Sequence, residues 1–118
     1  MSGSEELEQI QQKIRRFRDD REWKQFHDHK SLAASIVIEA SELLEHFQWK
    51  SIKEAEEYVV KHKEEVGEEI ADVLIYLLEL SDIMELDVLE AMRTKLEKNA
   101  IKYPVEKSRG NSRKYTQL

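Results

Sequence analysis

The stretch 65-EVGEEIADVLIYLLELSDI-83 decides the fold, because its pattern predicts a long helix with apolar residues on most of its sides. At about 100° per residue, the apolar residues of 70–78 spread almost all the way round the helix axis. One stripe is left over, and it is mostly acidic: Glu65, Glu69, Asp72, Tyr76 and Glu79. Glu69 and Asp72 are therefore expected to project side by side from one face.

These two carboxylates repel each other unless a positive charge lies between them, and no lysine or arginine occurs from residue 65 to residue 91. An ionised carboxylate in mostly apolar surroundings is costly unless it is paired or bound to a metal. A second pair, Glu39 and Glu42, has the same spacing in the apolar helical segment 36-IVIEASELLEHFQW-49. Two interpretations stay open: the pairs face each other and hold a divalent cation, or each is an ordinary solvated stripe.

Length, cysteine content and charge restrict the class of protein. A chain of 118 residues predicts a single domain over 1–118. Cysteine is absent, which excludes thiolate metal sites and fits a cytoplasmic protein. No apolar run is long enough for a membrane span, and the first residues lack the form of a signal peptide. The net charge of −6 argues against a nucleic acid polymer as partner, although residues 104–118 form a basic tail of charge +3.

Three glycines and one proline leave little chain for turns, so helices should dominate. We expect them over about Glu5–Asp20 with Ser4 as cap, from a Ser31 cap to about Trp49, from a Ser51–Glu54 capping box through Lys63, over 65–83, and from an Asp87 cap to Pro104. The pattern leaves open whether the chain bends or continues at Gly67. Ile38 points away from the main apolar face of its helix, and with 70–78 it predicts self-association.

Aromatic and basic side chains raise two further alternatives. In 21-REWKQFHDHK-30 the helical period fails, and Trp23 and Phe26 either plug the end of a helical bundle or form a stacking wall for a flat ligand. Along the last helix, Lys95, Asn99 and Lys102 form either a solvated basic edge or a phosphate contact. Combined with the acidic pairs, these features match the parts of a nucleotide, which are metal-bound phosphates and a stacked base.

The motifs 39-EASE-42, 68-EEIAD-72 followed by VLIYL, and 95-KLEKNAIKYP-104 resemble the MazG-type nucleotide pyrophosphohydrolases. The segments REWKQFH, FQWK and SRKYTQL resemble the small dCTP pyrophosphatase branch of that family. The resemblance implies an all-α, four-helix fold assembled as a dimer of dimers. It also implies hydrolysis of a nucleoside triphosphate such as dCTP to monophosphate and pyrophosphate in nucleotide pool sanitation, with Mg²⁺ as cofactor and Mn²⁺ as a substitute.

The resemblance also assigns site residues. It implies metal ligands at Glu39, Glu42, Glu69 and Asp72, a nucleotide pocket at Trp23, His27, Trp49 and Tyr76, a phosphate side at Lys95, Asn99, Lys102 and Tyr103, and a contributing tail at Arg113, Lys114 and Tyr115. Glu42 or Glu45 is the candidate base that activates water. Ile14 stands where vertebrate members have a histidine. Two other functions stay open, a helical interaction module without catalysis and a nucleotide sensor without turnover.

Overall fold

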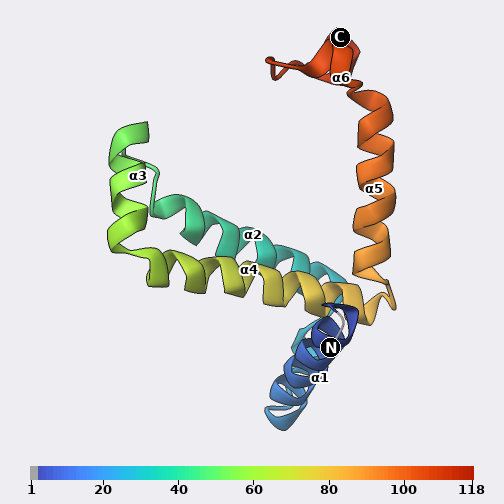
Figure 1. Cartoon of the computed structure of the whole chain (residues 1–118). Coiled ribbons are helices and arrows are strands. Elements are labelled where there is room, and N and C mark those ends of the chain that lie inside the picture. The colour runs from blue at the N-terminus through green and yellow to red at the C-terminus, as the bar shows by residue number, and fades with distance from the viewer. Residues whose placement is uncertain (1–2) are drawn as a thin grey trace. The chain divides into compact units, whose positions relative to one another are not determined.

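The computed structural model describes residues 3–118, and every regular element among them is helical (Figure 1). The α-helices are α1 (Gly3–Asp20), α2 (His29–Glu45), α3 (Ile52–Lys61), α4 (Lys63–Ile83), α5 (Val88–Lys102) and α6 (Val105–Ser108), and short 3₁₀ turns lie at Lys24–Phe26 and Tyr115–Gln117. The predicted all-α class is confirmed. Within residues 3–118, no helix combines the length and the apolar character that crossing a bilayer requires.

The chain divides into two compact units, one ending at Glu85 and the other beginning at Leu86. The first unit contains α1 to α4, and the second contains α5, α6 and the C-terminal residues. The assignment of the whole chain to a single domain stays a prediction.

Asp28, and not Ser31, caps the N-terminus of α2. The backbone N–H and the hydroxyl of Ser31 donate to the two carboxylate oxygens of Asp28, at 2.8 and 2.9 Å. Both residue types can cap a helix, and the helix begins earlier because Asp28 satisfies its free N–H group. Two other predicted boundaries were also wrong: Ser4 lies inside α1 rather than before it, and α2 ends at Glu45, so Trp49 lies in the turn that follows.

The other two predicted caps are confirmed. Ser51 and Glu54 form a reciprocal capping box at the start of α3, and the Asp87 side chain accepts from the Glu90 N–H at the start of α5. The break between α3 and α4 falls at His62, whose ring stacks on that of Tyr58 with 4.1 Å between ring centroids. The helix then continues without interruption through Gly67, which settles the question that the sequence left open.

The first unit is built on α2 and α4, which lie side by side and run in opposite directions, and α1 and α3 also pack on α4 (Figure 1). Within the single chain this arrangement buries few apolar side chains, chiefly Leu32 and Val66. Leu74 in the middle of α4 is 52% exposed, and Ile38 on α2 is 56% exposed. Residues 70–78, whose apolar side chains spread round α4, are therefore not buried on most sides within one chain. These helices carry a large unpaired apolar surface.

In the second unit the C-terminal tail folds back on the end of α5. The rings of Tyr103 and Tyr115 meet edge to face with centroids 6.1 Å apart, and the Lys102 ammonium lies 4.8 Å from the centroid of the Tyr115 ring. The predicted basic tail thus contains ordered structure, because aromatic and cation–π contacts hold it to the helix end.

Candidate active site

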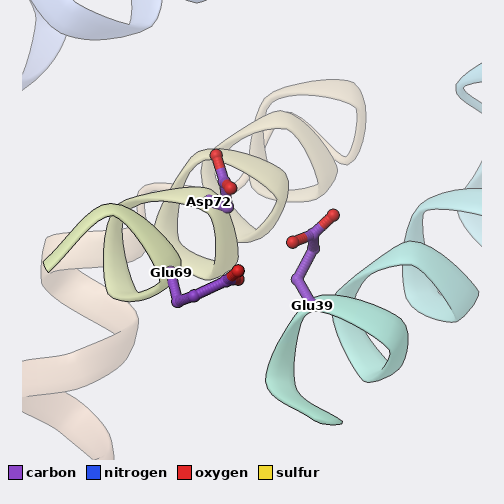
Figure 2. Close-up of side chains that lie close together, drawn as sticks. All are labelled: Glu39, Glu69 and Asp72. Atoms are coloured by element: carbon purple, nitrogen blue, oxygen red, sulfur yellow. The ribbon is translucent and has the colours of Figure 1, made fainter. Parts of the chain in front are cut away.

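Three carboxylates from α2 and α4 form an acid cluster: Glu39, Glu69 and Asp72 (Figure 2). One oxygen from each lies within 4.8 Å of the others. Figure 2 shows Glu39 and Glu69 pointing toward one another from the two helices, with Asp72 on the next turn of α4. The i, i+3 spacing on α4 and the antiparallel packing on α2 therefore bring together side chains from the two acidic stripes.

The fourth predicted ligand, Glu42, adjoins this cluster. Its carboxyl contacts those of Glu39 and Glu69 and raises the pKa of both groups. The larger cause in both cases is burial, and the pKa of Glu39 rises to about 7. Four acids packed this closely cannot all be ionised at neutral pH without a compensating positive charge.

Two oxygens of the acid cluster are buried without a partner. Within residues 3–118, neither Glu39 Oε2 nor Glu69 Oε2 has a hydrogen-bond donor. A buried carboxylate oxygen normally has one, so these atoms are available to a ligand that brings positive charge. Hard oxygen donors of this kind suit Mg²⁺ or Mn²⁺, and the residues present therefore fit a divalent cation.

A cavity of about 410 Å³, here called the aromatic cavity, adjoins the acid cluster in the first unit. It is lined by Ile14, Phe17, Trp23, His27, Tyr76 and Glu79, and it reaches Glu39 and Asp72. Three of the four predicted nucleotide-pocket residues thus meet here. Tyr76 is half-buried, and burial raises the pKa of its hydroxyl. Such a wall of rings beside a cation site can accept a flat ligand that carries phosphates.

The rings of the aromatic cavity contact one another in series. Trp23 lies 5.8 Å from Phe17 and 6.2 Å from His27, and His27 lies 6.2 Å from Tyr76, measured between ring centroids. Phe26 does not line the cavity and is exposed. Of the two alternatives for the loop aromatics, the structure therefore favours a ligand wall for Trp23 alone.

Glu79 is a site residue that the sequence did not single out. It lies on the acidic stripe of α4 but is buried, with a side chain only 6% exposed, and burial raises its pKa. Its Oε2 atom is 2.8 Å from His27 Nδ1, and His27 and Arg18 act to lower the pKa. Periodicity placed Glu79 on the right face, but only the packing of α1 and the 21–28 loop buries it.

A second cavity, here called the polar cavity, adjoins the acid cluster through Glu42 and Glu69 and measures about 400 Å³. The other lining residues are Glu45, His46, Lys50 and Tyr58. His46 Nδ1 lies 2.7 Å from the Tyr58 hydroxyl, and the Lys50 ammonium donates to the His46 carbonyl oxygen and lies 4.2 Å from the centroid of the Tyr58 ring. Lys50 and Tyr58 were also missed from sequence, because their meeting depends on the turn between α2 and α3.

The remaining predicted site residues lie outside both cavities. Trp49 is 87% exposed in the turn after α2. The predicted phosphate-side and tail residues lie in the second unit: Lys95, Asn99 and Lys102 on α5, Tyr103 at its C-terminal cap, and Arg113, Lys114 and Tyr115 in the tail. Their contacts with a nucleotide stay a prediction.

The chain is similar to known proteins over most of its length. The MazG-like family matches residues 34–118. The chain is 40% identical to dCTP pyrophosphatase 1 of Mus musculus and 37% identical to that of Homo sapiens, over 95% of this chain and 67% of each relative. A pyrophosphatase of known structure from Archaeoglobus fulgidus is 51% identical, with a TM-score of 0.79 over 88% of this chain and 94% of that one.

The chain therefore belongs to the MazG-like family. Its activity is that of a nucleotide pyrophosphohydrolase. This result removes the two alternatives without catalysis, the interaction module and the sensor.

Proposed function

We propose that this enzyme hydrolyses deoxynucleoside triphosphates, with dCTP among its good substrates, to the monophosphate and pyrophosphate in the presence of Mg²⁺. The observation that carries the proposal is the shared boundary of the acid cluster and the aromatic cavity, since Glu39 and Asp72 belong to both. The names of the mammalian relatives support dCTP as the substrate. Nucleotide pool sanitation is the corresponding role.

The residues that would hold the cation are Glu39, Glu42, Glu69 and Asp72. When bound, Mg²⁺, or Mn²⁺ in its place, supplies positive charge to the phosphates and lowers the pKa of the attacking water. The buried oxygens of Glu39 and Glu69 support this assignment, because the structure gives them no other positive partner within residues 3–118.

Glu42 or Glu45 would accept the proton of the attacking water, since both carboxyls line the polar cavity beside the acid cluster. The water oxygen adds to a phosphorus of the α,β bridge, and the bridging P–O bond breaks. Pyrophosphate leaves from one side of that bond and the nucleoside monophosphate from the other. The carboxylate then returns the proton to solvent.

The two cavities suggest an orientation for the substrate. The base enters the aromatic cavity and stacks on Trp23, because an apolar, ring-lined wall replaces its hydration favourably. The terminal phosphates extend toward the polar cavity, where the Lys50 ammonium lies near Glu42 and Glu69 and has no carboxylate partner among the salt bridges of residues 3–118. A cation held there offsets phosphate charge that the cluster would otherwise repel.

Self-association as a dimer of dimers completes the proposed function. The exposed side chains of α2 and α4, among them Val37, Ile38, Leu74 and Leu77, form an apolar surface that soluble monomers rarely leave open. Light scattering at micromolar concentration should therefore find no stable monomer, and Ile38→Asp should dissociate the assembly. A monodisperse, active monomer would contradict the proposal. The exposed Lys30→Asp change serves as the matched control.

The catalytic proposal is tested by incubating the protein with Mg²⁺ and a panel of nucleoside triphosphates and following the products by ³¹P NMR. Pyrophosphate and monophosphate should appear together, with dCTP among the fastest substrates. Inorganic phosphate and the nucleoside diphosphate as the first products would show that the β,γ bridge is broken instead. Omitting the metal, or replacing it with excess EDTA, should abolish product formation.

A further inference from the structure

Glu79 lies in the aromatic cavity on the same face of α4 as the acid cluster. Asp72, Tyr76 and Glu79 follow each other at four and three residues and all line the cavity, so one stripe of the helix runs along it. Seven residues of helix advance by about 10 Å. A nucleotide whose phosphates lie at Asp72 and whose base stacks near Tyr76 would therefore bring an edge of that base toward Glu79.

The carboxylate of Glu79 is not fully satisfied by hydrogen bonds within residues 3–118. Glu79 is buried, and although Oε2 lies 2.8 Å from His27 Nδ1, neither atom has an aligned hydrogen-bond partner among residues 3–118. A buried charge held only for structure is normally fully hydrogen-bonded, because each unpaired atom loses its hydration without replacement. Glu79 also lines the aromatic cavity, whose other lining groups are mainly apolar and aromatic.

Burial raises the pKa of the Glu79 carboxyl, while His27 and Arg18, which is itself buried, act to lower it. An ionised carboxylate can accept hydrogen bonds but cannot donate them. Ile14 contributes only apolar surface to the cavity, and Lys13, which also lines it, is exposed.

We propose that Glu79 is a specificity-determining residue that accepts a hydrogen bond from the exocyclic amine of the base, and so selects cytosine over uracil. This inference rests on the proposed function, since it assumes that the aromatic cavity takes the base. Cytosine presents an N4 amine at the position where uracil and thymine present a carbonyl oxygen. A carboxylate accepts from the amine, whereas it meets the carbonyl oxygen as a second acceptor and repels it.

The experiment compares the parent protein with Glu79→Gln, using dCTP and dUTP. An amide offers both a donor and an acceptor, so it can pair with either base. The ratio of kcat/KM for dCTP to that for dUTP should fall by roughly tenfold or more, mainly because dUTP improves. Glu64→Gln, which changes an exposed acid in the first turn of the same helix, should leave the ratio unchanged.

Binding is measured as well, by titrating the α,β-imido analogues of dCTP and dUTP into both proteins, and the same shift in ratio should appear in Kd. A purely structural role for Glu79 would lower the stability or activity toward both nucleotides and leave the ratio unchanged. An unchanged ratio therefore overturns the assignment of Glu79, while absence of turnover with every nucleotide would instead contradict the proposed function.

A test on the unaltered protein removes any dependence on the folding of the variant. The deoxynucleoside triphosphate of pyrimidin-2-one has the ring of cytosine without its amine, and the parent should bind and hydrolyse it at least about tenfold less well than dCTP. Equal kcat/KM for the two compounds would show that the amine is not recognised, and would overturn the proposal.

Discussion

The aromatic cavity and the polar cavity both border the acid cluster, yet their chemistry is opposite. The aromatic cavity is walled mainly by rings and aliphatic groups, and of its polar pair Glu79 is buried and His27 half-buried. The polar cavity contains the Lys50 ammonium and a hydrogen-bonded histidine and tyrosine, His46 and Tyr58. Because the two sides of the acid cluster differ, a ligand with one flat apolar end and one charged end can bind across it in a single orientation.

The largest effect is expected at the acid cluster itself, where the two cavities meet. Glu69→Gln should lower kcat/KM at least about a hundredfold for every nucleotide, because losing even an outer-shell partner of a metal ligand costs up to that much. Steady-state assays over a range of Mg²⁺ concentrations would measure it. Full turnover by this variant would show that the cation is held elsewhere, and Glu64→Gln is the control for loss of one acid from α4.

Lys50→Met tests the polar cavity. Removing a cation that faces phosphate charge should lower kcat/KM by about a hundredfold, as removal of a single stabilising donor does in other enzymes. The factor should be the same for dCTP, dTTP and dATP, since the phosphates do not depend on the base. A loss that differs between bases would show that Lys50 lies near the base and not near the phosphates. Lys53→Met, which changes an exposed lysine, is the control.

Trp23→Ala tests the aromatic cavity. Stacking on an aromatic side chain contributes roughly 1–3 kcal/mol per base and tolerates any base, so KM should rise by about tenfold for all nucleotides while kcat changes little. The same change at exposed Phe26 should have no effect on KM. An unchanged KM in Trp23→Ala would show that Trp23 only packs against Phe17.

The smallest effect concerns stability in the absence of metal. The pKa of Glu39 is about 7 in the folded protein against 4.5 ordinarily, so between these values the folded state binds more protons than the unfolded state. The free energy of unfolding contributed by Glu39 therefore falls as pH rises through this window. In EDTA, Glu39→Gln should gain a few degrees in Tm over the parent at pH 7.5 and less at pH 5.

Thermal scans at both pH values, with and without Mg²⁺, measure that difference in Tm. Saturating Mg²⁺ should raise the Tm of the parent and so remove the advantage of the variant. Parallel pH curves for parent and variant would mean that the carboxylates do not repel each other in the folded protein. Glu64→Gln should follow the parent at every pH.

Local pattern predicted much of this architecture because helical spacing is a property of neighbouring residues. Glu69 and Asp72 share a face whatever the rest of the chain does, and the Ser51–Glu54 box and Asp87 cap depend on only a few residues. The polar cavity could not be predicted in this way. Lys50 contacts Tyr58 only because a turn of four residues follows α2. The sequence pattern had predicted that this helix continues to about Trp49.

The burial of Glu79 was equally beyond a pattern argument. On the acidic stripe it looks like Glu65, which is exposed, and the two differ only in what lies over them. The cover comes from Arg18 and His27, which are far from Glu79 in sequence. Two capping residues three positions apart, Asp28 and Ser31, likewise gave no local signal to decide which one starts α2.

The small core of the first unit would, with the proposed self-association, make folding depend on protein concentration. With Leu32 and Val66 as its main buried apolar side chains, a single chain gains little from collapse, and the proposed self-association would supply further stabilisation. By mass action, the unfolding midpoint should then rise as protein concentration rises. The lifetime of the enzyme in a cell would then depend on its abundance. At low concentration its chains would be cleaved by proteases, whereas at high concentration association would protect them.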